Sequence, residues 1–202
     1  GLATVTVQTI RAGSQTAAFG DPGNAVSTHT RFDSDADGIP LLLRDRPVTS
    51  TDEDGITTTY DYVFGDYDSS SRVFTPGGAE SALRTLVSSS TAAAPNGIPG
   101  KSTQTLTIQN AAHGTTLYTA TLLVGTGGAS SPPISWQAHA YDDKNRLRST
   151  LYSDGSSATN AYSCCRLLWT QNRDGFKTLR SAETGKDHLY YAMEEVSLAQ
   201  LP

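Results

Sequence analysis

Asp-Gly pairs that recur between strand-like stretches constrain the fold of this chain more than any other feature. They occur at Asp37-Gly38, Asp54-Gly55, Asp154-Gly155 and Asp174-Gly175. Asp-Gly between runs of alternating residues is a strong signal for a β-hairpin, because glycine readily adopts the positive φ that two-residue primed turns require. Neighbouring pairs are 17 and 20 residues apart, and the central gap of 100 residues would hold about five units of that size. The sequence therefore predicts hairpins in series.

The stretches around these turns have the pattern of β-strands. Polar and apolar residues alternate in residues 4–8, 57–62 and 103–108, as expected for strands with one buried face. Residues 117–124 are rich in β-branched and apolar side chains, which predicts a more fully buried strand. Together with the turns, these strands predict an all-β fold of antiparallel hairpins.

Helical turns are expected to be few. Residues 78–87 form the main candidate for an amphipathic helix, because apolar residues recur there at helical spacing. Residues 191–198 form a second, shorter candidate. Serine and threonine are abundant elsewhere, and their side chains divert backbone hydrogen bonds away from helices.

Two stretches rich in Pro and Gly interrupt the strand pattern, at residues 88–102 and 125–135. Both are predicted to be surface loops, because Pro and Gly interrupt ladder hydrogen bonding. The first would divide hairpins in residues 1–87 from hairpins in residues 103–202. A single continuous domain is the alternative.

Charge and hydropathy limit the partners of the chain. The 202 residues carry a formal charge of −5 and no run of Lys or Arg that could follow a phosphate backbone, so nucleic acid is not an expected partner. No stretch approaches the roughly 18 apolar residues that a membrane-spanning helix needs. We therefore expect no membrane span.

A seven-residue motif occurs in two good copies, at residues 67–73 and 141–147. Each copy has Tyr-Asp, two variable residues, a small or turn-prone residue, Arg and an aliphatic residue. The motif residues are Tyr67, Asp68 and Arg72 in the first copy, and Tyr141, Asp142 and Arg146 in the second. The second copy continues to Asp154-Gly155 and then to Tyr162. This pattern resembles the YD-repeat, or RHS, family, whose unit runs roughly Tyr-Asp-x-x-Gly-Arg-Leu and continues to Asp-Gly and a further tyrosine.

Each residue type in the motif has a physical role. The tyrosine ring can stack on the sheet while its hydroxyl stays bonded, and the aspartate can cap the turn by accepting backbone N–H groups. The arginine then lies over a neighbouring ring. Ser71 stands at the turn position of the first copy, where a positive φ would be strained. Each unit leaves an apolar face uncovered, so the units must stack.

The resemblance implies a fold and a function. Members of the family are typically long exported proteins whose strands coil into a curved β-shell, which encloses a toxin or serves cell contact. This chain has too few units to close a shell. We therefore expect a structural or adhesive, non-catalytic segment of a larger protein that is secreted or held at the cell envelope. Its partners would be flanking repeats of the same protein, or a second copy paired through strand edges.

The aromatic residues of the C-terminal third suggest an alternative function. They are Trp136, Tyr141, Tyr152, Tyr162 and Trp169. Rings on one strand face would suit stacking against sugars, so a carbohydrate-binding module is the second hypothesis, although a repeated core explains the same residues. A glycan-active enzyme is the third hypothesis. No recognised catalytic motif supports it, and the histidines, such as His139, have packing roles as the simpler explanation.

An acidic segment at Asp33, Asp35 and Asp37 matches the start of a D-x-D-x-D-G calcium loop and ends in Gly38. Arg44 stands where an EF-hand carries its bidentate Glu, which excludes a complete EF-hand. An acidic hairpin turn and a Ca²⁺ site completed by other ligands both stay open. No other cofactor is expected.

Cys164 and Cys165 are the only cysteines. Neighbouring side chains on a regular strand point to opposite faces, so a bond between these two would require a distorted turn. In an oxidising compartment they could form a vicinal disulfide, and otherwise they would be two small buried hydrophobes.

Overall fold

The computed structural model describes residues 2–9, 25–35, 38–90, 102–124, 130–180 and 189–192. This part of the chain contains fourteen strands and one short 3-10 turn, η1 (Leu41–Leu43). The first seven strands are β1 (Leu2–Thr9), β2 (Ala25–Phe32), β3 (Pro47–Thr51), β4 (Thr57–Asp68), β5 (Val73–Pro76), β6 (Ala82–Ser90) and β7 (Ser102–Asn110). The others are β8 (Thr116–Val124), β9 (Ser130–Tyr141), β10 (Leu147–Tyr152), β11 (Ser157–Tyr162), β12 (Leu167–Gln171), β13 (Lys177–Arg180) and β14 (Leu189–Ala192).

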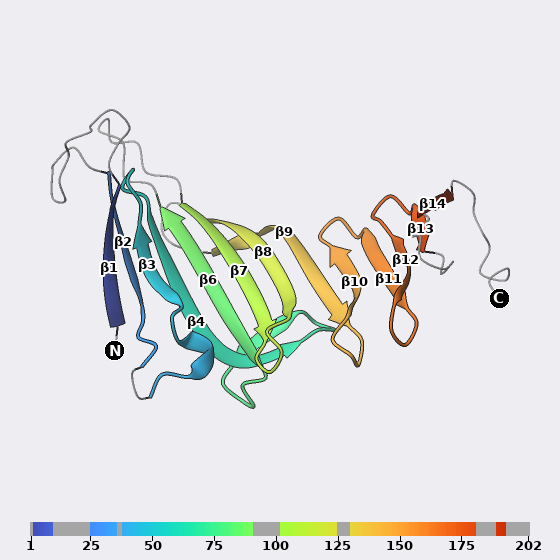
Figure 1. Ribbon diagram of the computed structural model, residues 1–202, viewed down its shortest axis with the longest axis horizontal. Helices are drawn as coiled ribbons and strands as arrows, with labels where there is room; N and C mark the ends of the chain where they lie inside the picture. The colour runs from blue at the N-terminus through green and yellow to red at the C-terminus, as the bar shows by residue number, and fades with distance from the viewer. Residues whose placement is uncertain are drawn as a thin grey trace.

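All strands belong to one open antiparallel sheet, which confirms the predicted fold class (Figure 1). The strand order follows the sequence from β1 at one edge to β14 at the other, and only β5 lies off this path, paired with β4. The sheet is therefore a row of hairpins. It continues across the Pro- and Gly-rich stretch at residues 88–102, because β6 and β7 pair from Ala82↔Asn110 to Ser90↔Ser102. Residues 91–101 lie outside the described part.

The helix predicted at residues 78–87 is wrong, because strand β6 occupies residues 82–90. The apolar residues that suggested a helix are explained by a strand covered on both faces. Ala82 and Leu83 point to opposite faces of the sheet, and each is only 1% exposed. A strand buried on both sides loses the alternation that distinguishes it from a buried helix segment. Of the second candidate helix, residues 191–192 belong to β14, and residues 193–198 lie outside the described part.

The loop predicted at residues 125–135 is also partly wrong, because β9 begins at Ser130 and contains Pro132 and Pro133. The pairing of β8 with β9 shifts register on both sides of the Leu122↔Pro133 pair. Proline is tolerated in strands where the ladder is irregular, so the bulged end of β9 accommodates both residues.

The core lies where a second layer covers the middle of the sheet. Beyond Gly65, strand β4 leaves its pairing with β6 and continues with β5 as a hairpin across one face. Tyr67 and Phe74 of this hairpin pack against the buried cluster, which consists of Ala82, Ile108, Tyr118 and Ala120. Figure 1 shows the hairpin passing below β6–β8 towards β9.

The segment that follows η1 reaches the opposite face of the same strands. Both terminal nitrogens of Arg46 lie 3.4 Å from Oε1 of Gln109 on β7, and the Arg46 guanidinium lies 5.7 Å from the Tyr62 ring centroid. Leu83 and Thr85 are buried on this face. The middle strands are therefore covered on both sides at one end. The described helical segment, η1, is far too short to cross a bilayer.

Candidate functional site

Four five-residue turns share one backbone geometry, at residues 52–56, 142–146, 152–156 and 172–176. In each turn the first N–H donates to the fifth carbonyl and the fourth N–H donates to the first carbonyl, over 2.9–3.1 Å. The fourth residue has a positive φ, which is 76° at Gly55, 57° at Asn145, and 84° at Gly155 and Gly175. The hairpins predicted from Asp54-Gly55, Asp154-Gly155 and Asp174-Gly175 are therefore confirmed. The predicted two-residue primed turns are wrong, because these turns are longer and need one left-handed residue.

Side chains at the first turn position bond further N–H groups of the turn. In three of the turns, Oδ1 of Asp52, Asp142 or Asn172 accepts hydrogen bonds from the N–H groups two and four residues further on, over 2.9–3.1 Å. This confirms the capping role predicted for the motif aspartate. Asx side chains favour this local bonding because they reach the backbone of their own turn.

The turn of the first motif copy has a different geometry. Asp68 accepts hydrogen bonds from Ser70 N–H at 2.8 Å and from the hydroxyls of Ser70 and Ser71 at 2.7 Å. The residue with positive φ is Arg72, at 59°, and not Ser71. The turn closes one residue tighter than its counterpart, because Asp68 pairs with Val73 whereas Tyr141 pairs with Leu147.

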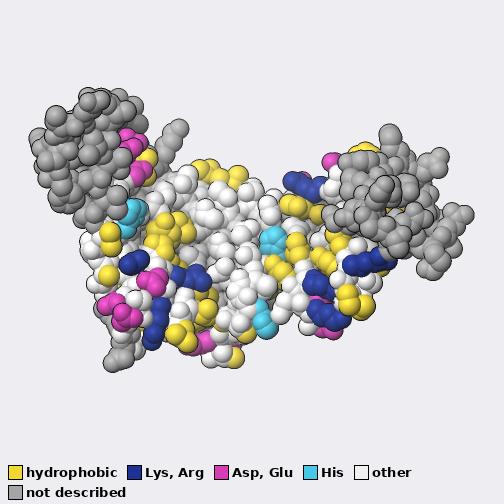
Figure 2. Space-filling view, in the orientation of Figure 1, with side chains coloured by type: hydrophobic (Ala, Val, Ile, Leu, Met, Phe, Trp, Pro, Cys, Tyr) yellow, Lys and Arg dark blue, Asp and Glu magenta, His cyan; other side chains and the backbone are white. Residues whose placement is uncertain are grey.

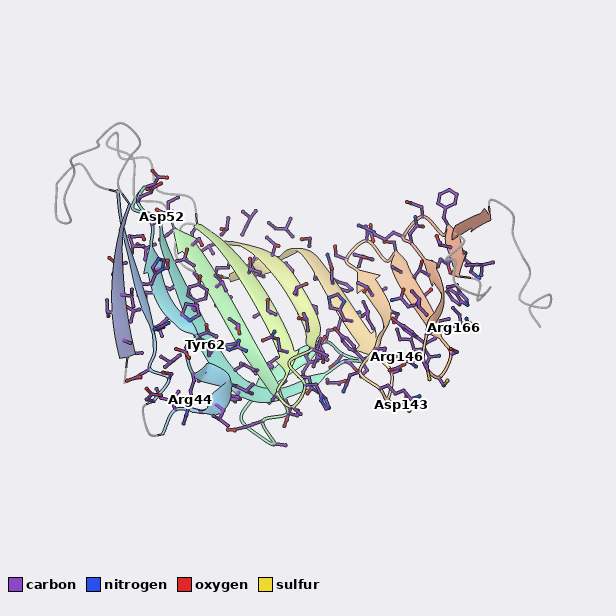
Figure 3. The ribbon with its side chains drawn as sticks, viewed as in Figure 1. Arg44, Asp52, Tyr62, Asp143, Arg146 and Arg166 are labelled. Carbon is purple, nitrogen blue, oxygen red and sulfur yellow. The ribbon has the colours of Figure 1, made fainter. Side chains whose placement is uncertain are left out.

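Arg146 links two turns at one end of the sheet. Its Nε donates to Asp142 Oδ2 at 2.8 Å, and its guanidinium lies 4.5 Å from the centroid of the Tyr162 ring. It also donates to the carbonyls of Ser163 and Cys164, at 2.9 and 3.2 Å. Figure 3 shows Arg146 beside the turn that carries Arg166. We call this arrangement, in which an arginine in the turn between two strands stacks on an aromatic ring of a third strand, a clamp.

Arg173 forms the corresponding clamp at the other end of β10 and β11. Its guanidinium lies 4.1 Å from the Tyr152 ring centroid, and it forms an ion pair with Asp154. Its Nε donates to Ser156 Oγ at 3.0 Å. Asp154 in turn caps its own turn by accepting from Ser156 N–H at 2.9 Å. Successive hairpins are thus joined at both ends.

A third clamp holds the crossing hairpin against the sheet. The Arg72 guanidinium lies 4.6 Å from the Trp136 ring centroid. Trp136 stacks on Tyr118 at 6.2 Å, and Tyr118 contacts Tyr67 at 6.1 Å between ring centroids. The predicted placement of both motif arginines over neighbouring rings is therefore confirmed. In each case the ring lies on a third strand, outside the two strands that the turn joins.

A longer repeat became evident only from the contacts. Tyr62 and Tyr162 each donate a hydrogen bond to the carbonyl fifteen residues earlier, at Pro47 and Leu147, over 2.8 and 3.1 Å. The residues before these carbonyls, Arg46 and Arg146, lie over the same two tyrosine rings. Residues 46–62 and 146–162 therefore repeat one hairpin.

A sequence signal for this repeat existed and was missed. An arginine stands eight residues before three of the Asp-Gly pairs, at Arg46, Arg146 and Arg166. In the first two copies a tyrosine follows the glycine after seven residues. The Tyr-Asp motif does not reveal this repeat, because the first of these copies has no Tyr-Asp before its arginine.

Three of the turn aspartates have a lowered pKa, which favours their charged form. Hydrogen bonds from Arg146 lower the pKa of Asp142 to about 2, and those from the Ser70 and Ser71 hydroxyls lower the pKa of Asp68 to about 2. The pKa of Asp154 is lowered by the Ser156 hydroxyl and, to a smaller extent, by Arg173. These carboxylates serve as hydrogen-bond acceptors in their turns.

The aromatic residues proposed to bind a glycan do not form one platform. Cross-strand pairing places Trp136 and Trp169 on one face of the sheet and the three tyrosines on the other. Four of the rings carry a cation, which is Arg72 on Trp136, Arg173 on Tyr152, Arg146 on Tyr162 and Lys177 on Trp169. The fifth ring, Tyr141, donates its hydroxyl to the Thr116 carbonyl at 2.8 Å.

The remaining candidates lie apart from the clamps. In the acidic segment, Asp33 Oδ1 accepts the Asp35 N–H at 3.1 Å, while Asp37 lies outside the described part. No group of three or more metal-ligating side chains occurs within the described ranges. His139 Nδ1 lies 3.1 Å from Thr150 Oγ1, and burial lowers the pKa of this histidine. Cys164 and Cys165 are exposed in a turn between β11 and β12.

The chain matches no protein-family model, and no curated protein is similar to it in sequence.

Proposed function

We propose that this chain is a structural or adhesive β-repeat segment of a larger YD-repeat-like protein that is secreted or held at the cell envelope. The observation that carries the proposal is the clamp. Asp142 with Arg146 and Tyr162, and Asp154 with Arg173 and Tyr152, direct their polar and aromatic groups at neighbouring hairpins of the same sheet. These groups already contact other residues of the sheet, so we assign them the role of holding hairpins in series.

The surface supports a scaffold role. Figure 2 shows basic and acidic side chains intermingled at both ends of the sheet, with mostly uncharged polar surface over its middle. No single-sign field of the kind that attracts nucleic acid is seen on this face. Among the described strands β1 lies at one edge of the sheet, and it is eight residues long and has no charged residue or proline. Native edges usually carry such protection, so we propose that a flanking strand of the parent protein, or a second copy, covers β1.

A glycan array with the purified chain separates the scaffold from a carbohydrate-binding module. The expected result is no reproducible binding, because the rings are stacked by cations and divided between two faces. Trp169→Ala is the informative variant, and Phe176→Ala is its control, because Phe176 is 55% exposed and has no stacking cation among the described contacts. Binding lost in Trp169→Ala but kept in Phe176→Ala would contradict the scaffold proposal.

The cellular location of the parent protein tests the other half of the proposal. An antibody raised against this chain should detect the parent protein in the secreted or envelope fraction of its native cells. Detection only in the cytosolic fraction would contradict an exported scaffold. A cytosolic enzyme used as a fractionation control shows whether the fractions are clean.

A further inference from the structure

Cys164 and Cys165 lie in a turn that brings their sulfur atoms together. The turn between β11 and β12 is closed by a hydrogen bond from Ser163 N–H to the Arg166 carbonyl at 2.9 Å. Within it the two Sγ atoms lie 2.9 Å apart, and both residues are exposed. Adjacent side chains on a regular strand would diverge, so this juxtaposition is a property of the turn.

Two cationic side chains fix the peptide that joins these cysteines. Arg146 and Lys144, from the neighbouring turn, both donate to the Cys164 carbonyl at 3.2 Å. Arg146 is itself held by Asp142 and by the Tyr162 ring. The contact with Cys164 raises the pKa of the Cys165 thiol, and Arg146 opposes this shift to a smaller extent. Both thiols are exposed, which gives a disulfide reagent access to them. The clamp therefore preorganises the cysteine pair.

We propose that Cys164 and Cys165 form a redox-active vicinal pair, which closes to a disulfide by exchange with a low-molecular-mass disulfide such as oxidised glutathione. One cysteine thiolate attacks a glutathione sulfur, the glutathione S–S bond breaks, and one glutathione leaves as a thiol. The neighbouring cysteine then attacks the protein sulfur of the mixed disulfide and releases the second glutathione. Two protein S–H bonds are lost, one S–S bond forms, and the two electrons reduce oxidised glutathione to two glutathione thiols.

The test uses the full reduced chain, incubated with oxidised glutathione, quenched with an alkylating agent and measured by intact mass. The expected product has lost two hydrogens, carries no alkyl label and retains no glutathione. Cys165→Ser and Cys164→Ser should instead accumulate the glutathione adduct, because they have no second thiol to displace it. A wild-type chain that keeps two alkylated thiols, retains glutathione as the variants do, or forms disulfide-linked dimers would overturn the proposal.

A trivalent arsenical gives a second readout that needs no oxidation. Phenylarsine oxide forms two As–S bonds with a pair of adjacent thiols and releases water. The reduced wild-type chain should retain one arsenical in the presence of excess monothiol, and both serine variants should lose it. Loss from the wild-type chain as well would show that the sulfurs are not held together in solution. Circular dichroism of each variant checks that its β-sheet is kept.

Discussion

At the scale of single residues, the tyrosines differ in what their hydroxyls do. The Tyr162 hydroxyl donates to Leu147, whereas the Tyr67 hydroxyl is buried in the contact between the crossing hairpin and the sheet with no partner. Burial raises the pKa of Tyr67 to about 12, with a smaller contribution from Tyr118. A buried hydroxyl without a partner destabilises the fold, and a bonded one stabilises it by about 1 kcal/mol.

This difference predicts opposite effects of one chemical change. Tyr67→Phe should raise the free energy of unfolding by about 1 kcal/mol, and Tyr162→Phe should lower it by about the same amount. Urea denaturation followed by circular dichroism measures both. The two variants are matched controls, since each removes one oxygen from a tyrosine next to an arginine. A loss of stability in Tyr67→Phe would show that its hydroxyl has a hydrogen-bond partner in solution.

The turn carboxylates predict how stability depends on pH. The pKa of Asp142 falls from an ordinary value of 3.8 in the unfolded chain to about 2 in the fold. Its contribution is therefore complete above the unfolded value and is lost as the pH falls from about 4 through about 2. Thermal melts across this window should show a steeper loss for the wild-type chain than for Asp142→Asn. Asp143→Asn removes a neighbouring carboxylate that acts on Arg146 through its charge and forms no hydrogen bond with it among the described contacts, so it should keep a slope close to that of the wild-type chain.

At the scale of elements, one glycine allows β4 and β5 to cross the sheet. A Cβ at Gly65 would collide with the Thr75 carbonyl oxygen and would lie 2.6 Å from Phe74 Cζ. The backbone there is not left-handed, so the requirement for glycine is one of space. The close approach of β5 at this point lets Phe74 reach the core.

Alanine substitutions at Gly65 and Gly77 distinguish a steric requirement for glycine from a requirement for positive φ. Gly77 has a φ of +79° and open space around its Cβ position, so Gly77→Ala should cost about 1 kcal/mol of strain. Gly65→Ala should cost more than Gly77→Ala and should also weaken near-UV circular dichroism, because displacement of β5 loosens the packing of Phe74 and Tyr67. Equal losses in the two variants would show that β5 can shift without harm to the core.

Sequence patterns predicted strands and turns correctly where these depend on neighbouring residues in the sequence alone. Alternation identified the strands around residues 57–62 and 103–108, and Asp-Gly identified three of the hairpins. They failed at β6, where coverage from both faces removes the alternation, and this coverage depends on segments remote in sequence. The motif predicted that its arginine lies over an aromatic ring. It could not predict which ring, because the positions of Trp136 and Tyr162 relative to the arginines depend on the register between strands.

At the scale of the whole molecule, the core is central and the ends of the sheet depend on other contacts. The buried apolar residues of the described part lie on β6, β7 and β8. Beyond them the sheet is held by ladders, capped turns and clamps. Such a sheet gains stability when further strands extend it, which is the property expected of a segment in a longer series.

The exposed edge at β1 leads to a prediction about self-association of the chain. Val5 of β1 is 41% exposed, and among the described strands β1 pairs only with β2, so isolated chains should self-associate with rising concentration through this edge. Val5→Lys places a charge on the edge strand and should shift sedimentation-velocity profiles towards monomer. Leu123→Lys is the matched control, because Leu123 is 55% exposed on β8, which has a neighbouring strand on each side. If Leu123→Lys abolished association and Val5→Lys did not, the contact would lie on the face of the sheet, and β1 would not be where the series continues.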